Sequence, residues 1–477
     1  MKIMMGIKVL LLDRKTDLVY NSRIAMMEVG QMKFFCVIIV LAVFVSVLNA
    51  ETIDLDMCIA EALEKSDSIK GRKSSVEALS YDAKSTYYNF FPTVDISYKY
   101  MKLEYYNKPD PIVLPISDPP VQFGFPLPEW QNSIEISAVQ PITSLWAINR
   151  GYSAKKLATE IERLRLTLDS NQLRTKIVEL YNSYQLLDEV SKLLDDTTVF
   201  LKRYKDTANN FVTEGMSDKR AVLKIDIELE RVAKEKQNAE GQKAVIKTAI
   251  ALFIDRDEES FTLISGNRRY SVISKSYQDL VDIQKSNRPE IKILKNADEI
   301  SEMISQASLS PFLPTVALAL GYKNDFEPSS LSPEGTFYFG GVVSWDIGSD
   351  FISNYYTYKK TKAEEIRTKF DGEAARKQML VQLKSVYSGI LVKESEITLS
   401  GKEIIEAEEN LRIEENKYNE KMTTETDLLN ALLNLKKANT SLISAYYNHK
   451  TALYSMANML GVNIDDISET TNNLINK

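Results

Sequence analysis

The chain has few of the side chains on which most enzyme and metal chemistry depends. Its 477 residues include one histidine, His449, and two cysteines, Cys36 and Cys58. A single histidine excludes a histidine metal cluster. Because His449 is expected mid-helix among Tyr446, Tyr447 and Lys450, Ser-His catalysis has no material either. The sequence also lacks a phosphate-binding loop and a dinucleotide fingerprint. We therefore predict that the protein is not an enzyme and needs no cofactor and no metal ion.

A strong net charge is also missing. The formal net charge is −7, and the Lys and Arg residues form no basic stripe, which argues against a nucleic-acid partner. Cys36 lies within a segment that we expect to be removed, so Cys58 would be the single cysteine of the mature chain. An internal disulfide bond is then excluded, and stability must come from packing.

The N-terminal region has the layout of a secretion signal. An apolar run from Phe34 to Leu48 follows a lysine and ends in Asn49-Ala50. About fifteen apolar residues are short for a spanning helix, which needs roughly twenty, although an N-terminal membrane anchor is the alternative. We predict a signal peptide at residues 32–50 and an upstream misannotated extension at 1–31.

The rest of the chain reads as a duplication. Phe91-Pro92-Thr93-Val94 returns as Leu313-Pro314-Thr315-Val316, and Ser68-Ile69-Lys70 returns as Glu290-Ile291-Lys292 at the same offset. Repeats of this size indicate a repeated structural unit. We predict a first repeat at 51–276, a second at 277–461 and a polar C-terminal tail at 462–477 that is loose from Thr470. Each repeat reads helix, strand, loop, strand and long helical hairpin.

Residues after each proline turn alternate between apolar and polar side chains, which is typical of half-buried strands. Strands are expected at about 94–100, 132–139, 316–322 and 337–345. Residues 101–130 hold seven of the fourteen prolines, so we expect an exposed loop without regular structure there. Residues 255–276 are expected to be irregular. A helix from residue 54 to the first proline turn should break near Asp67.

Two long hairpins follow the strands. Helical periodicity predicts helices from about Tyr152 to Phe211 and from about Ser353 onward, with a coiled-coil seam through Leu194 and Leu201. The first helix should reverse at residues 213–217, where a glycine permits a left-handed cap, and the second at 418–424.

Four strands cannot close a barrel, since about eight is the smallest number that does. A sheet with one apolar and one polar face, in an exported protein, fits a barrel with lipid outside and water inside. Oligomerisation is then required. The alternative is two soluble hairpins packed on a core.

Taken together, these features resemble the TolC-like outer membrane efflux protein family, the outer membrane factors, from about Ile53 to Gly461. The resemblance also rests on the turn segments Gly215-Met216-Ser217 with Val222-Leu223 and Met422-Thr423-Thr424 with 427–431. It implies an internally duplicated α+β membrane protein. Each protomer of a homotrimer would give four strands to a twelve-stranded outer-membrane barrel, continued by a periplasmic α-barrel of coiled-coil helices.

The resemblance also implies a function without chemistry. Such proteins are exit ducts in the outer membrane, in contact with its lipid, for tripartite efflux pumps or type I secretion. Their partners are a periplasmic adaptor (membrane fusion) protein and an inner-membrane transporter. A periplasmic coiled-coil adaptor or scaffold is the alternative interpretation.

The family resemblance places a gate at the hairpin ends. Asp427 would form an anionic ring, although a helix cap with Thr424 explains it equally well. Asn430 stands where a second acid is frequent. Tyr418 would tie the hairpins shut or simply pack at the seam, and Arg220 and Asp218 would supply partners for such ties.

The remaining candidate residues concern docking and the membrane. Adaptor docking is expected at the two hairpin turns, where Lys421 replaces a usual glycine and puts its left-handed cap in question; these turn residues are Gly215, Met216, Ser217, Lys421, Met422 and Thr423. Pro92 and Pro314 mark the turns that lead into strands. Aromatic girdles or ordinary core packing explain Trp130, Tyr98, Tyr100, Tyr105, Tyr106, Tyr322 and Trp345.

Overall fold

The structure is a computed structural model that describes residues 51–106, 110–124, 129–264, 270–326, 334–345 and 347–471. The predicted signal peptide and the extension before it lie outside these ranges. The chain forms two compact units. Described residues 51–65, 177–264 and 403–447 belong to unit 1, and 66–176, 270–402 and 448–471 belong to unit 2.

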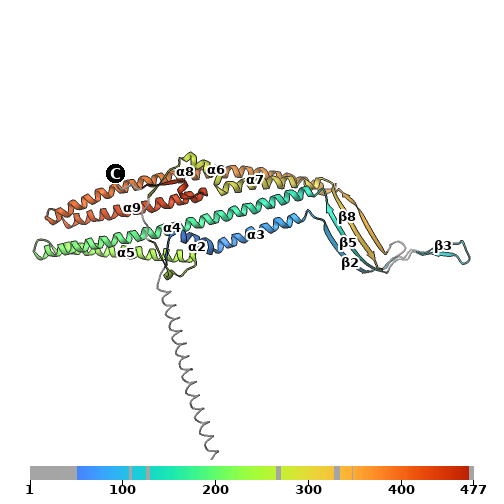
Figure 1. The fold of residues 1–477 in the computed structure, drawn as a ribbon, viewed down its shortest axis with the longest axis horizontal. Helices are drawn as coiled ribbons and strands as arrows, with labels where there is room; N and C mark the ends of the chain where they lie inside the picture. The colour runs from blue at the N-terminus through green and yellow to red at the C-terminus, as the bar shows by residue number, and fades with distance from the viewer. Residues whose placement is uncertain are drawn as a thin grey trace, which may run out of the picture. The chain divides into compact units, whose positions relative to one another are not determined.

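Unit 2 contains a four-stranded antiparallel sheet (Figure 1). Its strands are β2 (Thr93–Lys102), β5 (Trp130–Pro141), β8 (Thr315–Asp325) and β9 (Gly335–Ser344), in the order β2-β5-β8-β9. All four predicted strands are therefore confirmed. Within the described residues, β2 and β9 each have a strand partner on one side alone, so both edges of the sheet are open.

The register of the sheet separates an apolar face from a polar one. Ile96, Ile136, Tyr322 and Phe337 lie opposite one another across the four strands. The adjacent positions on the other face carry Asp95, Ser137, Gly321 and Tyr338. On the apolar face the side chains are not covered, since Ile96 is 69% and Phe339 is 74% exposed. The predicted alternation thus produces a two-faced sheet whose apolar side has no core beneath it.

The predicted structureless loop between β2 and β5 is wrong in one part. Strands β3 (Ile112–Leu114) and β4 (Val121–Phe123) pair there as a short antiparallel hairpin. The prolines lie outside these two three-residue strands, where a missing backbone N–H removes no ladder hydrogen bond.

Helices lead into and out of the sheet. Helix α2 (Leu55–Lys65) and helix α3 (Asp67–Tyr88) are separated at the predicted break, where the Ser66 hydroxyl accepts the Ile69 N–H. Helix α6 (Tyr277–Asn287) and helix α7 (Pro289–Ala307) precede β8 in the same way. Pro92 lies directly before β2 and Pro314 directly before β8, as predicted.

The two long hairpins are also confirmed. Helix α4 (Leu145–Thr213) has 69 residues and returns as α5 (Lys219–Ile254), while α8 (Ser349–Asn419) has 71 residues and returns as α9 (Glu425–Leu460). At 1.5 Å per residue, α4 and α8 are each about 100 Å long. Among the described residues, no helix combines the length and apolar content that a membrane-spanning helix requires.

Each unit has its own core. In unit 1 the core joins both hairpins and includes the predicted seam residues Leu194 and Leu201, packed with Ile225, Val232 and Leu432. In unit 2 a second core collects buried side chains of α6, α8 and α9, namely Leu280, Leu383, Ile390, Leu453, Met456 and Leu460.

Two sequence predictions about irregular segments are wrong. Within residues 255–276, β6 (Phe261–Leu263) pairs in parallel with β1 (Glu51–Ile53). The next strand, β7 (Tyr270–Ile273), pairs antiparallel with β10 (Ser468–Thr471), so the start of the predicted loose tail is ordered. These strands are only three or four residues long, and their partners are distant in sequence. Residues 472–477 lie outside the described ranges.

Candidate functional site

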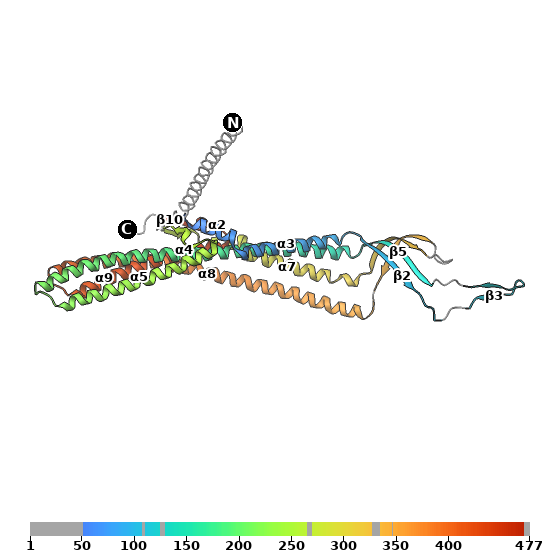
Figure 2. The ribbon, with the colours of Figure 1, turned by 90° about the horizontal axis from the view of Figure 1, so that it is seen from below.

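The two hairpins end side by side in unit 1, and most of the predicted site residues lie there (Figure 2). The α4–α5 turn closes with Met216 N–H and Ser217 N–H both donating to the Phe211 carbonyl, at 2.8 and 3.1 Å. In the α8–α9 turn, Met422 N–H donates to the Lys417 carbonyl at 2.7 Å. The two turns therefore use the same backbone device to end a helix.

Both turns need one left-handed residue. Gly215 has φ of 71° and Lys421 has φ of 62°. The doubt raised by the missing glycine is resolved, because Lys421 adopts the left-handed cap. The Lys421 ammonium lies 4.6 Å from the centroid of the Phe211 ring on the other hairpin. This cation–π contact offsets part of the backbone strain.

The apex of each turn presents a methionine. Met216 is 56% exposed and Met422 is 74% exposed, whereas the following Ser217 and Thr423 are half-buried. Flexible, polarisable methionine side chains are common at surfaces that bind other proteins. The predicted docking residues are thus brought to one end of unit 1, and whether they bind an adaptor stays a prediction.

Asp427 caps helix α9. Its carboxylate accepts the Thr424 hydroxyl at 2.7 Å and the Thr423 hydroxyl at 3.2 Å, and Asp427 N–H donates to the Thr424 hydroxyl at 3.3 Å. The predicted capping arrangement is therefore confirmed. The bonds from Thr424 hold the pKa of the Asp427 carboxyl below its usual range. Asp427 and Asn430 are both exposed, so capping leaves the proposed anionic ring possible.

Tyr418 lies in the core rather than at the surface. It is 5% exposed, and its ring packs against Tyr204 and Phe211 with centroid distances of 5.9 and 5.8 Å. The interpretation as a packed seam residue is confirmed. Because Tyr204 and Phe211 belong to α4, this packing itself joins the two hairpins.

Asp218 and Arg220 bond to each other. The Asp218 carboxylate accepts the Arg220 backbone N–H at 3.1 Å and its Nε–H at 2.9 Å, which caps α5. These bonds, the backbone one foremost, lower the pKa of the Asp218 carboxyl. In this chain the pair therefore stabilises one turn and does not link the hairpins to each other.

Three other cations make that link through ion pairs, and sequence reasoning missed them. We call these contacts the cross-hairpin ion pairs: Lys224 with Glu425, Arg203 with Glu415, and Lys436 with both Glu235 and Glu228. Lys224 Nζ lies 3.0 Å from Glu425 Oε1 and also donates to the Thr426 hydroxyl at 2.8 Å. Each pair joins α4 or α5 to α8 or α9. No local spacing in the sequence reveals partners about two hundred residues apart.

The aromatic residues proposed for the girdles are outside both cores. Tyr98, Tyr100, Tyr106, Tyr322 and Trp345 are exposed, while Trp130 stacks on Tyr100 at 5.3 Å between ring centroids. Tyr105 is half-buried. In the single chain these aromatic side chains therefore do not pack in a core. Their place at a membrane surface stays a prediction.

The described residues include no cluster of potential metal ligands. Across the described ranges, no three His, Cys, Asp or Glu side chains are grouped so that they hold a metal ion. His449 is buried, with Nε2 3.4 Å from a Glu394 carboxylate oxygen and its ring 5.3 Å from that of Tyr270.

Comparisons with known proteins identify the fold. No family model and no curated relative matches the sequence. Among solved structures, the outer membrane protein VceC from Vibrio cholerae is similar, with a TM-score of 0.70, 14% identity, and coverage of 86% of this chain and 96% of that one. The open state of the Neisseria gonorrhoeae MtrE outer membrane channel is also similar, with a TM-score of 0.67, 13% identity, and coverage of 86% of this chain and 89% of that one.

A third channel agrees with these two. The Campylobacter jejuni CmeC outer membrane channel has a TM-score of 0.67 and 13% identity, with 85% of each chain covered. The chain therefore has the fold of the TolC-like outer membrane channels, and the fold resemblance seen in the sequence is confirmed. Identities of this size establish the fold alone.

Proposed function

Starting from a fold shared with outer membrane channels, we propose that three copies of this chain form an outer-membrane exit duct that extends into the periplasm. The observation that carries the proposal is the sheet. Its apolar face is uncovered, and neither edge has a strand partner among the residues that the structure describes. A lipid-facing barrel needs an apolar exterior and no free edges.

Three copies satisfy both requirements. If β9 of each copy pairs with β2 of the next, twelve strands close one barrel, with Ile96, Tyr322 and Phe339 toward lipid. The row of Asp95, Ser137 and Tyr338 then lines the water-filled interior. The shared order of helices, strands and hairpin in residues 51–276 and 277–461 supports the proposed duplication.

The long hairpins continue the barrel as a periplasmic tunnel. The cross-hairpin ion pairs and the Tyr418 packing hold the two hairpin ends of each protomer together, which we take as the resting state of a gate. An adaptor that docks on Met216 and Met422 would separate the ends. Three Asp427 carboxylates around the threefold axis would favour cations in the opening.

Transport through such a duct is passive. The energy would come from an inner-membrane transporter joined through the periplasmic adaptor, in a tripartite efflux pump or a type I secretion system. The chain itself would catalyse no reaction. A soluble or anchored periplasmic scaffold is the competing function, and it requires neither a membrane nor a fixed number of copies.

The oligomeric state in detergent tests the proposal. We expect the mature chain to need detergent for solubility and to have the native mass of a trimer. Ile96→Arg and Leu318→Arg place a charge on the lipid-facing side and should block membrane assembly. Ser97→Arg is the matched control, because Ser97 lies on the polar face opposite Glu135. A detergent-independent monomer, or normal insertion of both lipid-face variants, would refute the proposal.

A further inference from the structure

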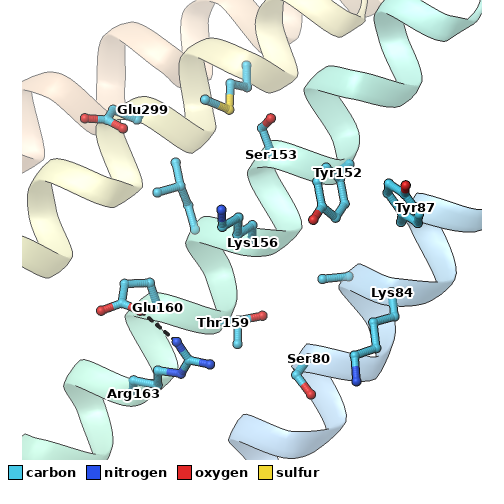
Figure 3. A pocket seen from close by; sticks show the side chains of 13 residues that line it. Ser80, Lys84, Tyr87, Tyr152, Ser153, Lys156, Thr159, Glu160, Arg163 and Glu299 are labelled. Atoms are coloured by element: carbon cyan, nitrogen blue, oxygen red, sulfur yellow. Dashed lines mark hydrogen bonds and ion pairs between the residues drawn. The ribbon is translucent and has the colours of Figure 1, made fainter. Parts of the chain in front are cut away.

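Unit 2 contains a cavity that the proposed duct does not use. It has a volume of about 600 Å³ and lies among α3, α4 and α7 (Figure 3). Tyr87 on α3 and Tyr152 on α4 form an aromatic wall, with ring centroids 5.5 Å apart. Ala83, Leu157 and Met303 add apolar surface. The cavity is therefore suited to a ligand with an apolar part.

The same cavity carries two cations without carboxylate partners. Lys84 and Lys156 both line it, and among the described residues neither ammonium has a carboxylate partner, although the Lys84 ammonium lies 5.1 Å from the ring centroid of Tyr81. The neighbouring Lys155, by contrast, is paired with Asp82 at 2.6 Å and is not among the lining residues. A ligand that fills the cavity can therefore supply the missing negative charge.

The other charged groups at the cavity already have partners. Arg163 is paired with Glu160 at 3.3 Å, and Glu299 lies 4.0 Å from Lys295. Two lysines therefore remain to attract an anion, and no unpaired carboxylate opposes them. Together with the aromatic and apolar wall, this favours an amphipathic anion over a small inorganic one.

The cavity also lies close to the sheet. Tyr87 is on the last turn of α3, which ends at Tyr88, and β2 begins at Thr93. Phe91 packs against Tyr87 with ring centroids 5.8 Å apart, so aromatic side chains continue to the start of the strand. Tyrosine rings are enriched at membrane–water interfaces, and lysines beside them attract anionic lipid headgroups.

We propose that this cavity binds the headgroup of an anionic phospholipid from the periplasmic leaflet of the outer membrane. Lys84 and Lys156 pair with the phosphate, and Tyr87, Tyr152 and Met303 contact the upper part of the acyl chains. The proposal rests on the proposed function, since only a barrel in the membrane brings lipid to the end of α3. The bound lipid would fix α3 against α4 directly below the barrel.

Native mass spectrometry tests this inference on the detergent-solubilised mature chain, which is first delipidated and then incubated with phosphatidylglycerol or phosphatidylethanolamine. We expect phosphatidylglycerol to be retained and phosphatidylethanolamine to be retained far less. Removing two lysines near an anionic headgroup by Lys84→Gln and Lys156→Gln should weaken retention of phosphatidylglycerol by roughly 30-fold. Both lysines are exposed, so the double variant is expected to fold.

A matched control removes the same charge elsewhere. Lys377→Gln with Lys402→Gln changes two exposed lysines of α8 and should leave retention unchanged. Equal retention in the Lys84 and Lys156 double variant would overturn the inference, as would equal retention of the two lipids. Displacement of phosphatidylglycerol by millimolar inorganic phosphate would show a soluble phosphate site and would also overturn it.

The native mass of the particle distinguishes failure of the lipid site from failure of the proposed duct. A trimer that retains no anionic lipid contradicts the lipid site and leaves the duct intact. A monomer that is soluble without detergent contradicts the duct, and the lipid site with it.

Discussion

Removing a cross-hairpin ion pair should make the proposed gate open more often. Lys224→Met deletes the ammonium that binds Glu425 and Thr426 but keeps the aliphatic stem. The two charged side chains are 49% and 24% exposed, so water screens the pair. We expect it to contribute about 0.5 kcal/mol per protomer, within the range measured for such pairs.

Symmetry multiplies this small contribution. If three protomers open together, the loss is about 1.5 kcal/mol, which is roughly a tenfold increase in the ratio of open to closed channels. The same change at Arg203 should add a similar amount. At Lys436, which is 14% exposed and lies near both Glu228 and Glu235, the change should add at least as much, so the triple variant should shift the ratio by about three orders of magnitude or more.

Single-channel conductance in planar bilayers measures this ratio directly. The difference between the variant and the parent chain should shrink between about 0.1 M and 1 M salt, because exposed pairs are screened. Arg412→Met is the control, since Arg412 is also exposed but pairs with Glu409 on the same helix and so does not link the hairpins. Unchanged open time in the triple variant, or an equal change in the control, would refute the gate.

Three further predictions follow from the hairpins and from α8. Asp427→Asn keeps a capping oxygen but removes the charge, so it should reduce cation selectivity in reversal-potential measurements while leaving the helix intact. Thr424→Ala, by contrast, should speed amide exchange at the start of α9. Equal cation selectivity in Asp427→Asn and the parent chain would exclude the anionic ring. Because the folded pKa of Asp427 is depressed, its capping contribution should be complete above about pH 4 and should fade as the pH falls through the folded pKa, seen as faster exchange in acid. Lys421→Gly should preserve the turn and Lys421→Val should destabilise it by about 1–2 kcal/mol, because a β-branched residue is strained at positive φ; similar melting temperatures for both variants would contradict this. Glu365 is buried and its pKa is lowered to about 2 by its bonds to Lys362, Lys369 and Ser305, so Glu365→Gln should lower the melting temperature at pH 7, with the difference lost between about pH 4 and pH 2; a difference that persisted below pH 2 would not fit.

Features with a strong local signal were predictable from the sequence. The alternation around Ile96 identified β2 because a strand turns successive side chains to opposite faces. The break near Asp67 was visible because Ser66 is a typical helix cap. In both cases the residues that determine the structure are neighbours in the chain.

Features that depend on distant partners were not predictable. Strand β7 forms because residues 468–471 pair with it, and no pattern within residues 270–273 predicts that partner. The sequence around Lys224 predicts a lysine on a helix, but it does not predict the ion pair with Glu425, which comes from the other hairpin. Lys421 violates the preference for glycine at a left-handed cap, and the ring of Phe211 that accompanies it comes from the other hairpin.

The open edges of β2 and β9 also determine how the chain must be handled during its biogenesis. Before assembly, each copy exposes two ten-residue strands with free backbone donors and acceptors beside an uncovered apolar face. Such edges pair readily with any strand they meet, so aggregation and correct assembly compete for the same surface. If the chain is exported and forms a trimer as proposed, newly exported copies would need a periplasmic chaperone that covers these strands until three copies meet. Overproduction of the chain would exceed the supply of this chaperone and favour aggregation.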